Sequence, residues 1–260
     1  MEVTDLKRAF DLAGRVAVVT GGNGGIGLGM ARGMAAAGAA IVVAGRNRDK
    51  SRRAVAELEG LGAKAVAIEV DVADEASVVA LVAQTVERLG RLDVLVNNAG
   101  INIRKPPHEL ALGEWRQVID TNLTSAFMAS HAAHPVMKKQ GGGKIINIGS
   151  MMSIFGAAFA PAYAASKGGL VQLTRSMATA WAPHHIQVNA VLPGWIDTEL
   201  TTNARREVPG LHERVLSRIP EGRWGAGDDM AGVAVFLASR ASDYVTGTAI
   251  PVDGGYSIMS

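Results

Sequence analysis

Short apolar segments alternate with longer amphipathic segments along most of the chain. The short segments are rich in β-branched residues and apolar at nearly every position, as is typical of parallel strands buried on both faces. Seven strands are predicted, at Val16–Thr20, Ala40–Ala44, Ala65–Val70, Val94–Asn97, Lys144–Ile148, Gln187–Leu192 and Ala249–Val252. The segments between them have helical spacing, at Gly27–Ala37, Asp49–Leu61, Glu75–Leu89, Gly113–His131, Ala162–Trp181 and Asp228–Leu237.

This alternation predicts the fold class. Strand–helix–strand units connect with a right-handed turn and build a parallel sheet that is covered by helices on both faces. We therefore expect an α/β protein with a single-domain Rossmann-type doubly wound fold over residues 1–260 and about seven parallel strands. The segment at about 198–227 interrupts the pattern after the sixth strand. Because ligands bind at the carboxyl ends of such strands, we interpret it as a substrate lid.

Composition narrows the functional classes. With 48% hydrophobic and 19% charged residues, the chain of 260 residues is not disordered. It has no cysteine, which excludes disulfides, thiolate catalysis and cysteine-bound zinc. The histidines lack metal-binding spacing, so no metal is expected. A net charge of +2 without long runs of like charge argues against nucleic acid. No apolar stretch reaches the ~18 residues of a membrane helix, and a cytoplasmic location is expected.

A glycine-rich segment joins the first strand to the first helix. Thr20–Gly27 reads T-G-G-N-G-G-I-G and fits both a G-x-G-x-x-G and a G-x-x-x-G-x-G register. Small residues let backbone N–H groups approach a phosphate, and the helix N-terminus adds a favourable dipole. In this position the segment indicates a dinucleotide site.

The end of the second strand bears on the choice of cofactor. A site for NAD places a carboxylate there to bind the adenosine ribose, but this strand is followed by Arg46 and has no acid before Asp49. A guanidinium at Arg46 suits a 2′-phosphate, so NADP(H) is preferred, with NAD(H) as the alternative. Asp71 is predicted to bond the adenine amino group, and the backbone of 97–100 to pass the adenine ribose.

Tyr163 and Lys167 share one face of a predicted helix because they are four residues apart. A nearby cation favours the phenolate, which brings the tyrosine pKa toward the range useful for proton transfer. Ser150 follows the fifth strand and Asn122 lies in the preceding helix. Together these four side chains are a candidate catalytic group for moving a proton to or from an oxygen.

Taken together, these motifs and the segment Pro193–Thr198 resemble the short-chain dehydrogenase/reductase family. The correspondence covers residues 10–256 in order. It implies that Tyr163 is the general acid or base and that Lys167 lowers its pKa and holds the nicotinamide ribose. It also implies that Ser150 hydrogen-bonds the substrate oxygen and that Asn122 anchors a water in a proton relay. Ile196 and Thr198 are implied to meet the nicotinamide carboxamide.

The complete set of cofactor-binding residues expected from pattern and resemblance is distributed over the carboxyl ends of several strands. It comprises Gly21, Asn23, Gly25, Ile26, Gly27, Arg46, Asn47, Asp71, Val72, Asn98, Ala99, Gly100, Tyr163, Lys167, Pro193, Gly194, Ile196 and Thr198.

The substrate is less strongly indicated. Segments 98–106, 218–225 and 241–247 resemble the sugar-acid branch of the family, which includes gluconate 5-dehydrogenases and 2-deoxygluconate 3-dehydrogenases. Arg104 follows the fourth strand and could face a carboxylate, or it could be a solvated loop residue. Several apolar residues expected around the cleft instead favour a bulkier ketone: Met151, Met152, Ile154, Phe155, Phe159 and Trp195.

Several alternatives therefore stay open. The preferred function is interconversion of a secondary alcohol and a ketone, on a sugar acid or related compound, by hydride transfer. A 3-oxoacyl reductase of the acyl-carrier-protein type and a reductase of a bulkier apolar ketone are alternatives. A regulatory protein that only binds NADP is disfavoured by the complete catalytic group. The resemblance also implies a homotetramer.

Overall fold

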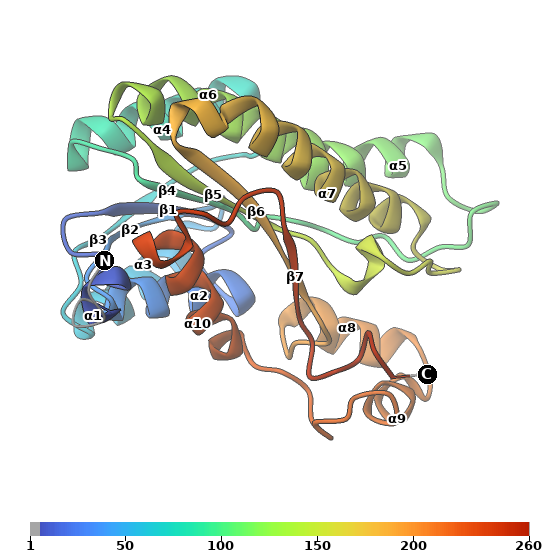
Figure 1. Ribbon diagram of the computed structural model, residues 1–260. Coiled ribbons are helices and arrows are strands. Elements are labelled where there is room, and N and C mark those ends of the chain that lie inside the picture. The colour runs from blue at the N-terminus through green and yellow to red at the C-terminus, as the bar shows by residue number, and fades with distance from the viewer. Residues whose placement is uncertain (1–5, 260) are drawn as a thin grey trace.

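The computed structural model describes residues 6–259 and is built around one parallel sheet (Figure 1). Its strands lie in the order β3-β2-β1-β4-β5-β6-β7. They are β1 (Val16–Thr20), β2 (Ala40–Ala44), β3 (Ala65–Ile68), β4 (Val94–Asn97), β5 (Gly143–Ile148), β6 (Ile186–Pro193) and β7 (Ala249–Val252). The single seven-stranded sheet confirms the predicted fold class.

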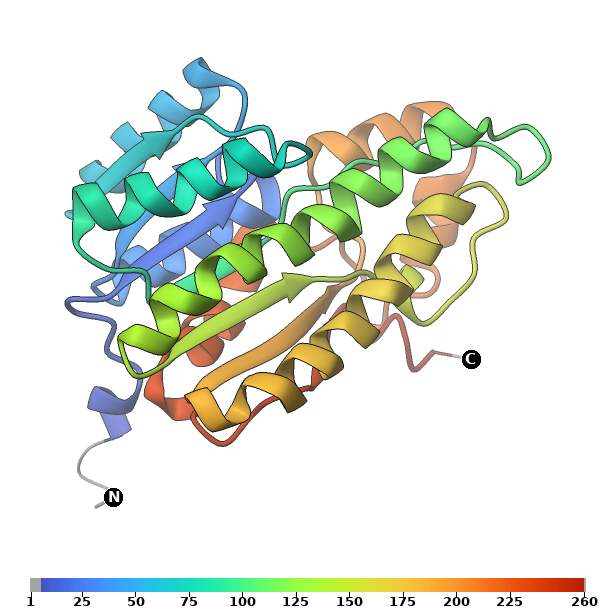
Figure 2. The same cartoon turned by 90° about the horizontal axis from the view of Figure 1, so that it is seen from above.

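Alternate residues of each strand face opposite layers of helices. Ala17 and Val19 pack under the layer of α2 (Gly25–Ala36), α3 (Arg48–Gly60) and α10 (Ala231–Ala238). Val16 and Val18 face the layer of α4 (Glu75–Leu89), α6 (Ser125–Lys139) and α7 (Pro161–Trp181). Figure 2 shows this second layer lying over the sheet, with its long helices running roughly along the strands. Burial of both faces explains why the strands are apolar throughout.

The predicted helix at 113–131 differs from the observed one. The structure divides it into α5 (Leu112–Ile119), a π-helical turn η2 (Asp120–Thr124) and α6, which runs on to Lys139. Pro135 lies inside α6, four residues beyond the predicted end at His131. A proline costs one backbone hydrogen bond and some crowding, and the buried face of α6 offsets that cost.

Several short elements have no strong sequence signature. They are α1 (Leu6–Ala9), the 3-10 turns η3 (Met151–Ser153), η4 (Ala182–His184), η5 (Gly227–Met230) and η6 (Arg240–Ser242), and the helices α8 (Glu199–Glu207) and α9 (Leu211–Leu216). The last two occupy the segment interpreted as a lid, and they lie beside the carboxyl end of β6 (Figure 1). Among residues 6–259, no helix has the length and apolarity needed to cross a bilayer.

The strand order places a binding site at one edge of the sheet. β2 and β3 lie on one side of β1, whereas β4 and the later strands lie on the other. The chain connections therefore leave in opposite directions from the carboxyl ends of β1 and β4. Such a switch point opens a crevice at the strand ends, where ligands of doubly wound proteins bind.

Candidate active site

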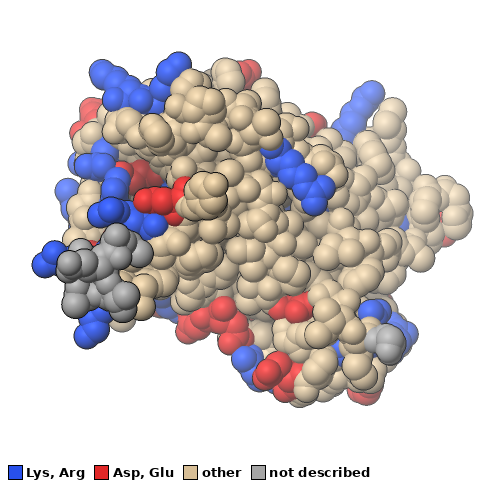
Figure 3. All heavy atoms as spheres, viewed as in Figure 1, with Lys and Arg blue, Asp and Glu red and all other residues tan. Residues whose placement is uncertain are grey.

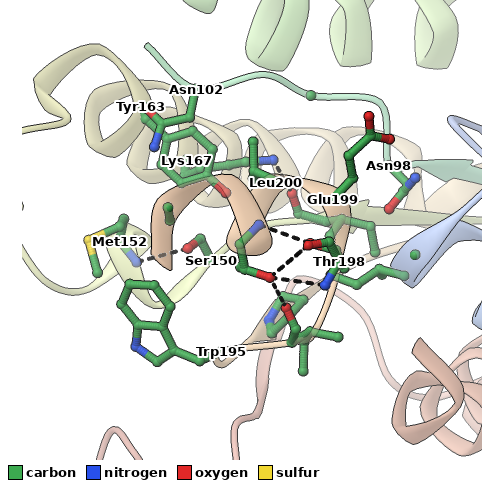
Figure 4. Close-up of a pocket in the computed structure, with 18 of the residues that line it drawn as sticks. Asn98, Asn102, Ser150, Met152, Tyr163, Lys167, Trp195, Thr198, Glu199 and Leu200 are labelled. Carbon is green, nitrogen blue, oxygen red and sulfur yellow. Dashed lines mark hydrogen bonds between the residues drawn. The ribbon is translucent and has the colours of Figure 1, made fainter. Parts of the chain in front are cut away.

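A cavity of about 380 Å³ opens at this edge of the sheet. Most of the predicted cofactor and catalytic residues line it: Gly21, Asn23, Gly25, Ile26, Asn98, Ala99, Gly100, Ser150, Tyr163, Lys167, Pro193, Gly194, Ile196 and Thr198. Arg104, Met152 and Trp195 line it as well. The cavity brings together residues at the carboxyl ends of β1, β4, β5 and β6 with residues of α7 and α8. Figure 4 shows Ser150, Tyr163, Lys167 and Trp195 around it.

The glycine-rich turn exposes its backbone to this cavity. Gly24 is the N-cap of α2 and provides no side-chain cap, so the first N–H groups of the helix are left for a ligand. A Cβ at Gly24 would meet no atom within 4 Å. Gly21 and Gly25 have φ angles of 63° and 51°, which favour glycine. An uncapped helix start beside open space fits the pyrophosphate of a dinucleotide.

Thr20 and Asn98 fasten the ends of β1 and β4 together. The Thr20 hydroxyl accepts hydrogen bonds from the N–H groups of Asn98 (3.0 Å) and Ala99 (3.1 Å). The Asn98 amide donates to the carbonyls of Thr20 (2.9 Å) and Gly21 (3.1 Å). A Cβ at Gly27 would lie 2.5 Å from this amide, so the close approach of the two segments requires glycine there. Gly27 does not line the cavity.

The candidate catalytic side chains are held by neighbouring backbone. Tyr163 and Lys167 lie in the first two turns of α7, and the Lys167 Nζ is 5.6 Å from the centre of the Tyr163 ring. That Nζ donates to the Ile148 carbonyl at 2.6 Å. The loop of Ser150 is tied to α7 because the Ser153 hydroxyl donates to the Lys167 carbonyl at 2.8 Å. Ser150, Tyr163 and Lys167 thus share one wall (Figure 4).

Burial is the largest influence on the pKa values of Tyr163 and Lys167. Burial raises the pKa of the Tyr163 phenol, while the Ser150 hydroxyl and the Arg104 guanidinium act in the opposite direction. Burial also lowers the pKa of Lys167, to about 8. With that pKa, Lys167 is still largely charged at neutral pH. Arg104 adds a second cation that favours the phenolate, and the predicted effect of Lys167 on the Tyr163 pKa stays a prediction.

Asn122 does not line the cavity. It lies in the π-helical turn, 2% exposed, and its Oδ1 accepts from the N–H of Ile101 at 2.8 Å. Its Nδ2 donates to the Ile101 carbonyl at 2.9 Å and to the Ser166 hydroxyl at 3.1 Å. These bonds fasten the segment after β4 to α7. The predicted role of Asn122 in a proton relay stays a prediction.

The residues predicted for the adenosine end also lie outside this cavity. Arg46 and Asp71 line an open groove beside β3, and Arg46 is exposed with no ion pair among residues 6–259. Asn47 caps α3 by accepting from the N–H of Lys50 at 2.9 Å. Val72 does not line the cavity. The groove adjoins the carboxyl ends of β2 and β3, as an adenosine site would require.

The comparison with protein families identifies the fold family. A family profile described as "Enoyl-(Acyl carrier protein) reductase" matches residues 21–257. The chain belongs to the short-chain dehydrogenase/reductase family. It is an oxidoreductase of the NAD(P)-dependent type, as the motifs predicted.

Several relatives of this oxidoreductase are named as dehydrogenases of sugar acids. The chain is 44% identical over 249 residues to a 2-dehydro-3-deoxy-D-gluconate 5-dehydrogenase of Escherichia coli, covering 95% of this chain and 97% of the relative. It is 38% identical over 249 residues to the gluconate 5-dehydrogenase of Gluconobacter oxydans, covering 96% and 97%. The crystal structure of a gluconate 5-dehydrogenase from Burkholderia cenocepacia with NADP and tartrate has a TM-score of 0.92 at 39% identity, covering 98% of this chain and 99% of that chain.

The part of the cavity expected to take the substrate carries both apolar and charged side chains. Met151, Met152, Phe159 and Trp195 line it, whereas Ile154 and Phe155 do not. Phe155 instead packs edge-on against Tyr256, at 6.3 Å between ring centres. The expectation that Ile154 and Phe155 line the cleft is therefore wrong. Both follow the 3-10 turn η3, which directs the chain away from the cavity.

Several residues that line the cavity were not predicted from the sequence. Lys50, Asn102, Glu199, Leu200 and Thr201 all border the cavity. Their positions depend on how α3 and α8 pack across the sheet edge, and no local motif marks them. Among residues 6–259, no group of three or more His, Asp or Glu side chains is arranged to hold a metal ion.

Proposed function

We propose that this protein is an NADP(H)-dependent oxidoreductase that interconverts a secondary alcohol and a ketone on a gluconate-type sugar acid. The observation that carries the proposal is the position of Arg104, a cation that lines the same cavity as Tyr163 and Ser150. A guanidinium at that point suits a carboxylate on a substrate whose reacting carbon faces the tyrosine. The sugar-acid relatives support the same substrate class.

The proposed chemistry follows from the residues around the cavity. When bound, the nicotinamide cofactor supplies or accepts the hydride. In reduction, Ser150 and Tyr163 donate hydrogen bonds to the substrate oxygen as negative charge develops on it. Tyr163 then delivers its proton to that oxygen. In oxidation, the same tyrosine removes the hydroxyl proton, and Lys167 orients the ligand beside it.

The cofactor preference rests on Arg46. Its exposed guanidinium has no ion pair among residues 6–259 and borders the groove of Asp71, where the adenosine end would lie. A free guanidinium can bind a 2′-phosphate, whereas a carboxylate would repel it. The NADP-bound relative supports this preference.

The experiment is a fluorescence titration with NADPH and NADH in parallel, followed by turnover with gluconate, 2-dehydro-3-deoxy-D-gluconate and 5-keto-D-gluconate. We expect tighter binding of NADPH, and an Arg46→Ala variant should lose about tenfold or more of that affinity while NADH binding is retained. Arg53→Ala is the control, because Arg53 is also exposed on α3. Equal binding of both cofactors would contradict the NADP preference, and no turnover of any sugar acid would contradict the substrate class.

The 3-oxoacyl reductase remains the second candidate because apolar side chains such as Met152 and Phe159 line the cavity. An acyl carrier protein is acidic and would need a basic docking patch beside the cleft. On the face drawn in Figure 3, acidic and basic side chains are mixed around the lower right, where α8 and α9 lie. That mixture favours the small sugar acid. A 3-oxoacyl thioester added to the substrate panel separates the two candidates.

The proposal includes three further features: a single catalytic domain with a lid at about 198–227, a homotetramer and a cytoplasmic location. The lid is supported by α8, because Glu199, Leu200 and Thr201 border the cavity. The tetramer is supported by apolar side chains exposed on α5 and α6. The cytoplasmic location is the one expected from the sequence.

A further inference from the structure

Three cations line the cavity, and two of them are already paired with glutamates of α8. Lys50 Nζ lies 2.6 Å from a carboxylate oxygen of Glu199, the first residue of the helix. Arg104 Nη1 lies 2.8 Å from a carboxylate oxygen of Glu207, the last residue. The third cation is Lys167. One helix thus places a carboxylate against a cation at each of its ends.

Glu207 pairs with Arg104, a cation that lines the cavity together with Tyr163, although Glu207 itself does not line the cavity. The Arg104 side chain is only 13% exposed, and its Nη2 donates to the Leu200 carbonyl at 3.1 Å. Its charge acts on Tyr163, since it lowers the pKa of the phenol against the effect of burial. A carboxylate bound to Arg104 would therefore sit near the reacting oxygen. Glu207 therefore offsets the charge of the cation that the carboxylate of a sugar acid would face.

Glu207 is not required by its own helix. The C-terminus of a helix carries partial negative charge, so an acid in the last turn is unfavourable. Arg205 and Arg206 in the same turn already provide the favoured cations. The Glu207 side chain is 54% exposed, and among residues 6–259 it forms an ion pair or side-chain hydrogen bond with Arg104 alone. The ion pair with Arg104 therefore accounts for an acidic residue at this position.

We propose that Glu207 sets the preference of the enzyme for acid over neutral substrates by competing with the substrate carboxylate for Arg104. This inference rests on the proposed function. Two carboxylates on one guanidinium repel each other, so Glu207 weakens binding of an anionic substrate and leaves a neutral one unaffected. Glu207 is therefore a specificity-determining residue outside the catalytic group.

The test compares kcat/KM for 5-keto-D-gluconate and for its methyl ester in the wild type and in Glu207→Gln. The acid-to-ester ratio should rise about three- to tenfold, because the competing charge is removed but partly screened by solvent. Glu57→Gln is the matched control: Glu57 also pairs with an arginine, Arg32, but neither residue lines the cavity, so the ratio should stay at the wild-type value. Arg104→Met should lower the ratio, since it removes the shared cation.

A second measurement does not depend on turnover. The affinity of the NADPH-loaded protein for tartrate, followed by tryptophan fluorescence, should increase in Glu207→Gln and stay constant in Glu57→Gln. An unchanged or lower acid-to-ester ratio in Glu207→Gln, or an equal change in both variants, would overturn the role of Glu207. If no sugar acid is turned over by the wild type, the proposed substrate class fails, and unchanged tartrate affinity in Glu207→Gln then overturns this inference separately.

Discussion

At the scale of single residues, Tyr163 is held in a setting that keeps its proton. Burial raises the pKa of its phenol, so the side chain is protonated at neutral pH and is poised to donate in the reducing direction. Tyr163→Phe removes the transferable proton but retains the ring that borders the cavity. We expect kcat to fall about 10²- to 10⁴-fold.

The same variant should bind NADPH nearly as tightly as the wild type. Stopped-flow or steady-state turnover gives kcat, and fluorescence titration gives the cofactor dissociation constant. Tyr256→Phe is the control, because Tyr256 packs against Trp195 at 6.3 Å and does not line the cavity. Turnover that survives in Tyr163→Phe would show that another group moves the proton.

Lys167 makes stability depend on pH. Its ammonium releases a proton near pH 8 in the folded protein because burial lowers its pKa from the ordinary 10.5. Between those two values the unfolded chain holds more protons, so the free energy of unfolding rises with pH. Below pH 8 both states are charged, and the penalty for burying the ammonium is complete. Lys167→Met removes this penalty.

The stability of Lys167→Met relative to the wild type should therefore be greatest below pH 8. The difference should shrink by roughly 3 kcal/mol as the pH approaches 10.5. Urea unfolding of both proteins at several pH values between 7 and 10 measures it. Lys64→Met is the control, because Lys64 is exposed. A difference that is constant over this range would mean that Lys167 titrates like a surface lysine.

Sequence spacing predicted that Tyr163 and Lys167 share one face of a helix and that the glycine-rich turn opens on a ligand site, because each of these features follows a local rule. Tyr163 and Lys167 are four residues apart on one helix, and the glycine-rich turn follows directly on a strand. The pair of Arg104 and Glu207 follows no such rule, since its members are 103 residues apart and meet only through the packing of α8. Pairings of that kind become visible only when the tertiary structure is known.

At the scale of elements, apolar runs predicted the strands well because buried parallel strands carry no competing polar pattern. β1, β2, β4 and β7 have the predicted limits. The helices were located less sharply. The π-helical turn that holds Asn122 is hidden in a continuous amphipathic stretch, and α8 is polar with its buried residue Ala204 isolated in the sequence.

Helix α2 crosses the turn η5 so closely that only glycine fits. A Cβ at Gly29 would lie 2.0 Å from the carbonyl oxygen of Gly227 and 2.2 Å from its carbon, and backbone atoms cannot yield as a flexible side chain does. Gly29→Ala should therefore lower the free energy of unfolding by about 2–3 kcal/mol. Equilibrium unfolding in urea measures the change.

Gly232→Ala is the matched control within α10. A Cβ there would meet no atom within 4 Å, and alanine favours the helical backbone. That variant should gain about 0.5–1 kcal/mol. Wild-type stability in Gly29→Ala would mean that α2 and η5 lie farther apart than the structure places them.

At the scale of the whole molecule, the right-handed connection rule predicted a doubly wound sheet, and the strand order placed the switch point between β1 and β4. The position of the cavity follows from that order. The association of chains does not follow from it, because a helix face that packs within one chain and a face that packs against another chain have the same apolar pattern.

Helices α5 and α6 carry large apolar side chains that are exposed to solvent in the single chain. Leu112 and Phe127 are 62% and 49% exposed, although the opposite side of α6 is buried against the sheet. Large apolar side chains left in solvent at the edge of the outer helix layer favour contact with a second chain. If four chains of 27.1 kDa associate, light scattering should give a mass of about 108 kDa.

A charge placed in that contact should weaken it. Phe127→Glu should lower the mass toward that of a dimer or a single chain, because an unpaired carboxylate in an apolar interface loses its hydration. Leu61→Glu is the control, since Leu61 is 56% exposed at the far end of α3 and its variant should keep the wild-type mass. A wild-type mass near 27 kDa would exclude the tetramer, and an unchanged mass in Phe127→Glu would place the contact on another face.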